Sequence, residues 1–573
     1  MSGCLAIALL SGYFGGCVKQ VGVQEKSDIS YLYVNTRDCG YGDGYLKALE
    51  PIFEERYAQT SFAEGKTGVD LVVATSANLA GVQYRDTMAN STYNVSVFEG
   101  MYYFDYLAGN YLYDITKIVK NEQLADGTGT IENKLFDDQK AALTADNGKY
   151  YVLPVFAGIS GITYDADLFE DNFLYFADAD GVKPTGNSSY TGAPYTGRGI
   201  DATGMAKRSP GPDGKYNTYD DGLPSSYEEF FWLLDTMVEM SITPLVWTGN
   251  SQHYTNYLFE ALLGANSSKA ELLSHFTFDS GDEEVEIIKS FNGDTPVTEK
   301  VKITLENGYL ASHQKSRYEA LKFLHHIFNT NEKYYDSRCT TSALSNTQAQ
   351  KVFEESSLDP LSQDIAMLLE GGYWYNEAQP ELQESIGKYG AAAKNRNFKY
   401  MPLPAIETGT VNENEGSTIV LADAFNIYAA VNNNIKDNAE KVKLAETFIK
   451  FMYEDASLQL MNTTTGVPLA VNYELTEAQK AGLDNYPRSL WDIYDFSKDN
   501  GAYATTMSAN SVFMNHTDKF GFKTTTKFFT SYIGGIEYSY PNVTFWNGKA
   551  TAKTYFEGMK LTESEWKTTY YKK

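Results

Sequence analysis

Short apolar segments alternate with amphipathic ones near the start of the chain. Residues 30–34, 69–74 and 93–98 are rich in β-branched and aromatic side chains, which predicts three strands. Between the first two, Leu46 and Leu49 fall on one face of a helical pattern. Strands that alternate with helices favour a parallel sheet, and ligands of such sheets bind in loops beyond the carboxyl ends of the strands. The pattern therefore predicts an α/β fold with candidate ligand loops after the first and third strands.

The middle of the chain combines a long extended run with a break in the hydrophobic pattern. Residues 151–164 are extended and apolar, without a turn signal before Gly158. Residues 178–223 are rich in Gly, Ser, Thr, Pro and Asp, which predicts an insertion or a long loop. Helical periodicity resumes with a capping box, in which Ser226 precedes Glu229 by three residues. The apolar stripe that follows predicts a helix packed against the core.

The charge balance excludes several classes of function. The 573 residues include 47 Lys and Arg against 74 Asp and Glu, which gives a formal net charge of −27. Affinity for a phosphate backbone comes mainly from Lys and Arg, so we expect no nucleic-acid partner. Binding to an anionic lipid surface by charge is disfavoured for the same reason. The length and a hydrophobic fraction of 43% predict about two to four folded domains.

Aromatic residues are frequent, at 14% of the chain, and Tyr is the most common of them with 44 copies. A tyrosine offers an apolar ring and a wettable hydroxyl, which suits a surface that binds polar ligands. The alternative is that Tyr is simply the habitual large residue of this organism. The placement of the rings decides between the two interpretations.

The first residues predict export from the cell. Residues 5–10 are apolar but too short to span a bilayer, so residues 1–16 are interpreted as a signal peptide. Small residues directly before Cys17 favour its lipidation, with a tether over 17–27. The alternative is a plain cleaved signal with an incidental cysteine, and residues 1–3 lack the positive charge that usually opens a signal. We expect a protein at the extracellular face of the cell membrane, held there only by its lipid anchor.

The remaining cysteines and the histidines indicate no required cofactor. Cys39 and Cys339 are two thiols in a long mature chain, which does not make a disulfide scaffold. The six histidines show no zinc-ligand spacing.

One acidic loop is a candidate metal site. Asp213, Asn217, Asp220 and Asp221 place carboxylate and amide oxygens close together in the sequence. Calcium prefers about six to eight such hard oxygen ligands. The spacing departs from an EF-hand, because no Glu stands at its last ligand position. A structural calcium ion and a solvated acidic turn are the two alternatives.

Several segments, taken in order, resemble one known family. They are Tyr33-Val-Asn-Thr36, Tyr151-Val-Leu-Pro154, Gly161-Ile-Thr-Tyr-Asp-Ala-Asp-Leu-Phe169, Pro224-Ser-Ser-Tyr-Glu-Glu-Phe230, Ala366-Met-Leu-Leu-Glu-Gly-Gly-Tyr-Trp374, Pro402-Leu-Pro404, Lys443-Leu-Ala-Glu-Thr-Phe-Ile-Lys-Phe451 and Gly466-Val-Pro468. In this order and spacing they resemble the extracellular solute-binding proteins of bacterial ABC importers, especially the carbohydrate-binding lipoproteins of Gram-positive bacteria.

The resemblance implies an α/β, bilobal fold like that of periplasmic binding proteins, with a hinge and a central ligand cleft. By position, lobe one comprises residues 28–158 and 418–475, and lobe two comprises 160–415 and 476–573. It further implies a monomer without catalytic activity that captures a carbohydrate, in particular an oligosaccharide, by lobe closure. Its partners would be that sugar and the permease subunits of an ABC transporter.

The candidate ligand-binding residues combine these loop positions with the family pattern. Aromatic rings stack on the C–H faces of a sugar, while carboxylates, amides and guanidinium groups pair with its hydroxyls. Tyr373 and Trp374 correspond to the stacking aromatic of the family, and Ser160 and Asp423 lie near the expected lobe crossings. The other candidates are Asn35, Arg37, Asp38, Glu99, Tyr102, Trp247 and Tyr254. For each aromatic residue, the alternative is a packed core ring.

Two other functions are compatible with the sequence. A surface-anchored glycosidase would also be acidic and rich in Tyr, and it needs two carboxyl groups that flank the scissile bond. With 74 acidic residues such a pair stays open. A surface adhesin would need no ligand cleft. The order of the family segments favours binding.

Overall fold

The computed structural model describes residues 25–37, 40–76, 84–85, 88–89, 92–100, 103–178, 181–201, 203–252, 254–329, 333–360, 362–406, 420–423, 427–506, 520 and 530–572. The predicted lipidation site Cys17 and the candidate ligand residues Asp38 and Tyr102 lie outside the described residues.

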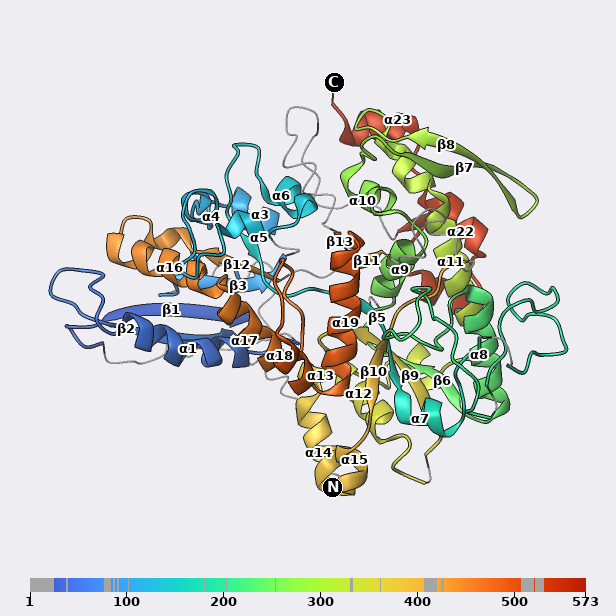
Figure 1. Cartoon of the computed structure of the whole chain (residues 1–573). Coiled ribbons are helices and arrows are strands. Elements are labelled where there is room, and N and C mark those ends of the chain that lie inside the picture. The colour runs from blue at the N-terminus through green and yellow to red at the C-terminus, as the bar shows by residue number, and fades with distance from the viewer. Residues whose placement is uncertain are drawn as a thin grey trace, which may run out of the picture.

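The first of two main sheets has the strand order β2-β1-β3-β12-β4. Its strands are β1 (Ser30–Arg37), β2 (Val69–Ser76), β3 (Val95–Glu99), β4 (Leu153–Pro154) and β12 (Ile427–Val431). β1, β2 and β3 run parallel as predicted, whereas β12 runs antiparallel to β3 and β4. The sheet therefore combines the amino-terminal strands with one strand that returns from far along the chain (Figure 1).

The helices of this lobe cover its sheet with apolar faces. Leu46 and Leu49 are fully buried in α1 (Gly44–Tyr57), as their spacing predicted. The other helices of this part of the chain are α3 (Tyr103–Ala108), α4 (Thr116–Lys120), α5 (Ile131–Lys134), α6 (Asp137–Leu143), α16 (Ala439–Met452) and α17 (Asp455–Thr465). α1 packs on β2 and α17, and α16 packs on β1, so one buried core joins distant segments of the chain.

The second main sheet has the order β10-β5-β9-β6 and mixes directions. Its strands are β5 (Ser160–Asp165), β6 (Thr243–Val246), β9 (Ile365–Gly371) and β10 (Phe398–Met401). β6 is parallel to β9, while β5 is antiparallel to both β9 and β10. The α/β class and the two sheet-bearing lobes are thus confirmed, but the expectation of parallel strands holds only locally.

The remaining elements surround the second sheet or extend from it. Its helices are α7 (Ala166–Asp171), α8 (Tyr227–Glu239), α9 (Tyr254–Ala265), α10 (Lys269–Thr277), α11 (Lys315–Phe328), α12 (Asn346–Glu355), α13 (Trp374–Glu377), α14 (Gln379–Tyr389), α15 (Ala391–Lys394), α18 (Glu477–Gly482), α19 (Asn485–Asp499), α21 (Pro541–Trp546), α22 (Ala552–Met559) and α23 (Glu563–Glu565). Two hairpins, β7 (Glu284–Asn292) with β8 (Thr295–Lys302) and β14 (Ser531–Ile533) with β15 (Ile536–Tyr538), complete this side.

The chain crosses between the sheets at several points that lie together. The predicted extended run 151–164 is divided, because β4 belongs to the first sheet and β5 to the second. Ile159, in the link between them, forms a bridge to Asp423. β11 (Leu421–Asp423) pairs in parallel with β13 (Tyr503–Thr505) in the same region. The crossings form a narrow waist between the lobes, and α19 stands beside it (Figure 1).

Candidate functional site between the lobes

The carboxyl ends of β1, β3 and β4 in the first sheet and of β6 and β9 in the second point toward the crossings. In the first sheet, β1 ends at Arg37 and β3 at Glu99, and the short link from β4 to β5 starts from the same edge. In the second sheet, β9 ends opposite Ser160, where β5 begins. The two edges therefore face each other across the waist, which is where an α/β protein binds its ligands.

The lobe-one edge carries a buried ion pair. The guanidinium of Arg37 contacts the carboxylate of Glu99, and both side chains are about nine-tenths buried. Burial raises the pKa of Glu99, while the positive charge of Arg37 opposes that rise. Both residues are the last of their strands rather than loop residues, because β1 stays paired with β2 as far as Arg37. The pair holds two charged groups at a fixed place on the rim.

Asn35 lies deeper in the same sheet. Its side chain is fully buried and its amide donates to the hydroxyl of Tyr84 at 3.5 Å. The strand was predicted to end at residue 34, but Asn35 pairs with Ala74 in β2. The side chain therefore supports the rim from within the lobe.

The lobe-two edge carries two carboxyl groups that sequence reasoning missed. Glu370, at the end of β9, accepts from the backbone N–H of Gly371 at 3.0 Å. The amide of Gln350 donates to Glu377 at 2.7 Å and to Glu370 at 3.4 Å. Burial and the charge of Glu377 raise the pKa of Glu370 well above its ordinary range. The signal available in the sequence was an acidic residue at the end of a wholly apolar strand.

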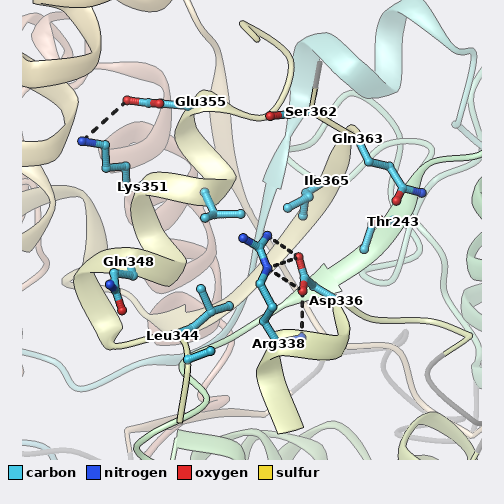
Figure 2. Close-up of a pocket in the computed structure, with 12 residues that line it drawn as sticks. Thr243, Asp336, Arg338, Leu344, Gln348, Lys351, Glu355, Ser362, Gln363 and Ile365 are labelled. Carbon is cyan, nitrogen blue, oxygen red and sulfur yellow. Dashed lines mark hydrogen bonds and ion pairs between the residues drawn. The ribbon is translucent and has the colours of Figure 1, made fainter. Parts of the chain in front are cut away.

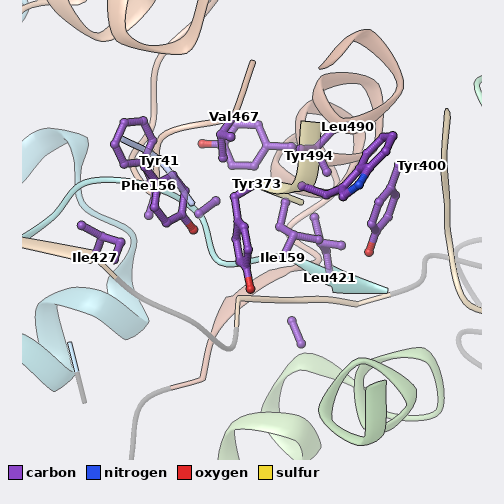
Figure 3. Packing of buried hydrophobic residues seen from close by; sticks show 14 of the residues in the cluster. Tyr41, Phe156, Ile159, Tyr373, Tyr400, Leu421, Ile427, Val467, Leu490 and Tyr494 are labelled. Atoms are coloured by element: carbon purple, nitrogen blue, oxygen red, sulfur yellow. The ribbon is translucent and has the colours of Figure 1, made fainter. Parts of the chain in front are cut away.

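Tyrosines from both lobes meet above this carboxyl pair. Burial and the charge of Glu370 raise the pKa of Tyr254 and of Tyr373. The ring of Tyr373 lies 5.5 Å from that of Tyr41, which belongs to the loop after β1 (Figure 3). Asn376 donates to the carbonyl oxygen of Gly40 at 2.7 Å, so a second contact joins the lobes at this point.

The ring of Tyr373 can approach lobe one this closely because Gly40 has no side chain. A Cβ atom on Gly40 would lie 2.3 Å from Cδ2 of Tyr373, which no real contact tolerates. The tyrosine ring therefore packs on the backbone of lobe one itself. The structure brings together Arg37 with Glu99 and Tyr254 with Tyr373, and their role in binding a ligand stays a prediction.

The two candidate tryptophans are placed differently. Trp374 is fully buried, with its ring centroid 5.3 Å from that of Phe398 and 5.1 Å from that of Tyr486. Trp247 is also fully buried, and its nearest ring is Tyr335 at 4.9 Å. Neither indole has an open face in this structure. Periodicity alone could not separate these core rings from exposed ones.

Ser160 and Asp423 belong to the crossing itself. Asp423 is fully buried and accepts from the backbone N–H of Gly158 at 2.6 Å and from the hydroxyl of Tyr503 at 2.5 Å. Burial raises its pKa to about 7. Ser160 is buried as well, and its carbonyl oxygen accepts from Tyr400 at 3.0 Å. These residues fix the path of the chain between the lobes.

A polar pocket opens at the opposite end of the second sheet. It has a volume of about 510 Å³ and is lined near the amino ends of β6 and β9 by Thr243 and Ile365 (Figure 2). Asp336 and Arg338 in its wall are already paired, because the guanidinium of Arg338 donates three hydrogen bonds of 2.5 to 3.1 Å to the carboxylate of Asp336. The pocket is therefore distinct from the edge where strand ends of both lobes meet.

The acidic loop lies in the region before α8 and packs on Phe496 of α19. Asp213 and Asp220 are buried, whereas Asn217 is exposed and Asp221 half-buried. Asn217 adopts a left-handed backbone with φ of 62°, and Asp221 accepts from its backbone N–H at 2.8 Å. The loop is thus closed on itself around two buried carboxyl groups.

Comparisons with known proteins give similarity in structure but none in sequence. No protein-family model matches the chain, and neither does any curated protein. A probable secreted solute-binding lipoprotein from Streptomyces coelicolor is 11% identical, with 85% of this chain and 91% of that chain covered at a TM-score of 0.47. A chitin oligosaccharide binding protein is 14% identical, with 93% and 98% covered at 0.49.

A third solved structure is the solute-binding protein RafE in complex with raffinose. It is 14% identical, with 92% of this chain and all of that chain covered at a TM-score of 0.48. Solute-binding proteins are thus among the solved structures that this chain is similar to, and at these identities the similarity identifies neither its family nor its ligand.

Proposed function

We propose that this chain is the extracellular substrate-binding component of an ABC importer, and that it captures a carbohydrate between its two lobes. The observation that carries the proposal is the meeting of Tyr41 from lobe one with Tyr373 from lobe two at the chain crossings. Ionisable groups lie at the same two edges, with the ion pair of Arg37 and Glu99 in lobe one and the carboxyl group of Glu370 in lobe two.

This set of groups matches the chemistry of a sugar. An aromatic face covers the C–H surface of a pyranose, while carboxylates and guanidinium groups form strong hydrogen bonds with its hydroxyls. The charged groups are held by protein partners before any ligand arrives, so less conformational freedom is lost on binding. An oligosaccharide is the ligand class that uses both kinds of group over an extended edge.

Capture requires the lobes to separate and close. Tyr373 is covered by Gly40 and Tyr41 of the opposite lobe, so a ligand reaches its ring only after the lobes part. The waist offers a suitable hinge, since few segments cross it and Asp423 ties them together. The closed shape would then be what the permease subunits recognise.

Export and anchoring are part of the proposal. No helix among the described residues has the length and apolar character needed to cross a membrane. A lipid on Cys17 would hold the chain at the outer face of the cell membrane. Metabolic labelling with a fatty-acid analogue should label the wild-type chain and leave Cys17→Ser unlabelled, and equal labelling of both would reject the anchor.

A ligand screen tests the central proposal. The purified protein is incubated with raffinose, chitin oligosaccharides, xylo-oligosaccharides and malto-oligosaccharides, and its melting temperature is measured with each. We expect one class to raise the melting temperature by several degrees, as mass action requires of a ligand that binds only the folded state. Chromatography of the same mixtures should return the sugars intact.

The outcomes separate the alternatives. Cleavage of an oligosaccharide would establish a glycosidase and reject the binding function. No shift with any sugar, together with no heat in calorimetric titration, would reject carbohydrate as the ligand. For a sugar that does bind, Tyr373→Ala should weaken affinity at least tenfold, because its ring is the stacking surface shared by both lobes.

A further inference from the structure

We propose that the loop from Asp213 to Asp221 is a calcium site that fastens the long segment before α8 to the second lobe. This inference is independent of the carbohydrate site. It rests on two buried aspartates joined by a hydrogen bond, on a buried carboxylate oxygen that no described residue satisfies, and on the absence of an ion pair from a described Lys or Arg to the loop.

The two aspartates are buried by the loop that carries them. Asp213 exposes 2% of its surface and Asp220 none. The backbone N–H of Asp213 donates to Oδ2 of Asp220 at 2.9 Å, and the hydroxyl of Thr218 donates to Oδ1 of Asp220 at 3.0 Å. The carboxyl of Asp220 is therefore turned inward, toward residue 213.

One oxygen in this arrangement has no protein partner. Oδ1 of Asp213 accepts from the backbone N–H of Lys215 at 2.7 Å, but its buried Oδ2 accepts nothing from the described residues. The hydrogen bond from the backbone of Asp213 to Oδ2 of Asp220 holds the two residues side by side. A buried carboxylate oxygen without a donor costs free energy unless a cation or a proton satisfies it.

Positive side chains nearby are engaged elsewhere. Lys215 lies over the ring of Phe496, with its Nζ 4.5 Å from the ring centroid. Arg208 pairs with Glu170 at 2.6 Å and stacks on Tyr175. Across the described ranges, no Lys or Arg forms an ion pair with an aspartate of this loop.

A second acidic group provides a contrast. Glu474, Asp495 and Asp499 lie close enough together to share an ion. The ammonium group of Lys498 contacts all three, at 3.1 Å from Asp495 and 3.6 Å from Asp499, so this cluster already holds its cation. The loop at Asp213 differs, because it offers two buried aspartates that form no ion pair with a described Lys or Arg.

The ligand set favours calcium over other ions. Carboxylate, amide, hydroxyl and backbone oxygens in an irregular loop suit an ion that accepts about six to eight oxygens in flexible geometry. Gly211 lets the loop close, because a Cβ there would lie 2.1 Å from the carbonyl oxygen of Asp220 and its φ is 63°. Exposed Asn217 and half-buried Asp221 leave room for water ligands.

The ion would act on the segment that carries the loop. Tyr219 packs on α19, with its ring centroid 5.8 Å from that of Phe496. A cation shared by Asp213 and Asp220 would join the two ends of the loop that carries Tyr219. Binding of calcium should therefore stabilise the docking of the segment against the lobe.

Calcium titration of the purified full chain tests the proposal. After removal of metal with EDTA and dialysis, calorimetric titration with CaCl₂ should show one site per chain. Addition of 1 mM CaCl₂ should raise the melting temperature by about 5 °C, and 1 mM MgCl₂ should raise it less, since magnesium demands a more regular shell.

Asparagine variants locate the site. Asp213→Asn and Asp220→Asn should each weaken calcium binding at least tenfold, while Asp171→Asn, an exposed residue of α7, should bind as the wild type does. Because each variant removes the repulsion between the pair, it should melt at or above the wild-type temperature in EDTA, which separates lost binding from misfolding.

Two results would overturn the proposal. One is the absence of both heat and a melting shift at 5 mM CaCl₂, with the pair instead sharing a proton and the protein becoming more stable as the pH falls. The other is an unchanged calcium response in Asp213→Asn and Asp220→Asn, which would place the ion elsewhere.

Discussion

At the scale of single residues, a buried carboxyl group holds the crossing between the lobes. Asp423 has no solvent exposure, yet it carries a carboxyl group that two donors satisfy. The sequence marked it as a residue near a crossing, and the structure assigns it to the crossing itself. The sequence pattern shows the position of Asp423 along the chain. It does not show that its hydrogen-bond donors come from Gly158 and Tyr503.

Asp423 should make stability depend on pH. Burial raises its folded-state pKa to about 7, whereas an unfolded Asp titrates near 4. The folded state therefore keeps its proton longer, and stability is lost as the pH rises from about 4 through 7. Asp423→Asn should remove about 2–3 kcal/mol of the loss between pH 5 and pH 8.

Urea unfolding at pH 5, 6, 7 and 8 checks this prediction. Buried Glu260 and half-buried Glu271 have pKa values raised by desolvation to about 8 and about 7, so they add their own slope in the same direction and act as an internal reference. The same slope in the wild type and in Asp423→Asn would contradict the assignment.

Trp374 tests whether a ring packs or binds. It is enclosed by Phe353, Phe398 and Tyr486, so Trp374→Phe should leave a cavity and cost about 1–3 kcal/mol of stability. Affinity of the folded protein for its ligand should stay within about twofold. Paired unfolding and calorimetric measurements check both, and a tenfold loss of affinity at unchanged stability would show that the indole stacks on the ligand.

At the scale of helices and strands, the sequence predicted best those features that depend only on residues close together in the chain. The start of α8 is an example, since the side chain of Ser226 accepts from the backbone N–H of Glu229 as predicted. The second half of the capping box differs, because Glu229 accepts from Ser225 at 2.8 Å and from Arg198 at 3.2 Å. Backbone N–H groups of Arg198 and Ser225 take the Glu229 carboxylate that the capping box would use. The sequence around residue 226 gives no sign of the bond from Arg198.

Removing the side-chain cap of α8 should lower the stability of the protein. Ser226→Ala leaves the first turn of α8 without its acceptor and should destabilise the protein by about 1 kcal/mol. Ser226→Thr keeps the hydroxyl and should lie close to the wild type. Chemical denaturation of the three proteins checks this, and equal stability of Ser226→Ala and wild type would show that another group caps the helix.

The strand ends show the limit of local signals. Arg37 and Glu99 were expected in loops because the apolar and β-branched runs that predict the two strands end at residues 34 and 98. Pairing with β2 and β12 instead extends both strands to these residues. Where a strand stops depends on its neighbours, and the neighbour of Glu99 comes from residue 427.

At the scale of the whole molecule, the contact between lobes decides how the site is formed. Gly40 and Asn376 lie 336 positions apart, yet they share a hydrogen bond. The tyrosine ring next to Asn376 packs against the backbone of Gly40. Closure of the lobes therefore depends on one residue having no side chain.

Gly40→Ala should hold the lobes apart. The added methyl would meet the ring of Tyr373 at 2.3 Å, so the contact cannot form as it stands. We expect a larger radius of gyration by small-angle X-ray scattering and at least tenfold weaker binding of the sugar found in the screen. Gly387→Ala, where an added Cβ meets nothing within 4 Å, is the matched control. Unchanged scattering and affinity in Gly40→Ala would show that this contact plays no part in closure.

The sequence by itself determined the fold class and the local helices and strands. Apolar periodicity specified the α/β class, the helix faces around Leu46 and the start of α8, because these depend on residues a few positions apart. The charge balance argues against a nucleic-acid partner, and the spacing of acidic residues drew attention to the loop at Asp213.

Only the tertiary structure decided how those parts meet. Tyr41 and Tyr373 come together because distant segments of the chain meet at the facing edges of the two sheets, and Glu370 and Glu377 share the amide of Gln350 from α12. The same packing buries Trp247 and Trp374, which the sequence could not distinguish from surface rings. The physical reason is that burial and pairing are properties of neighbours in space, and at the waist between the lobes those neighbours are hundreds of residues apart.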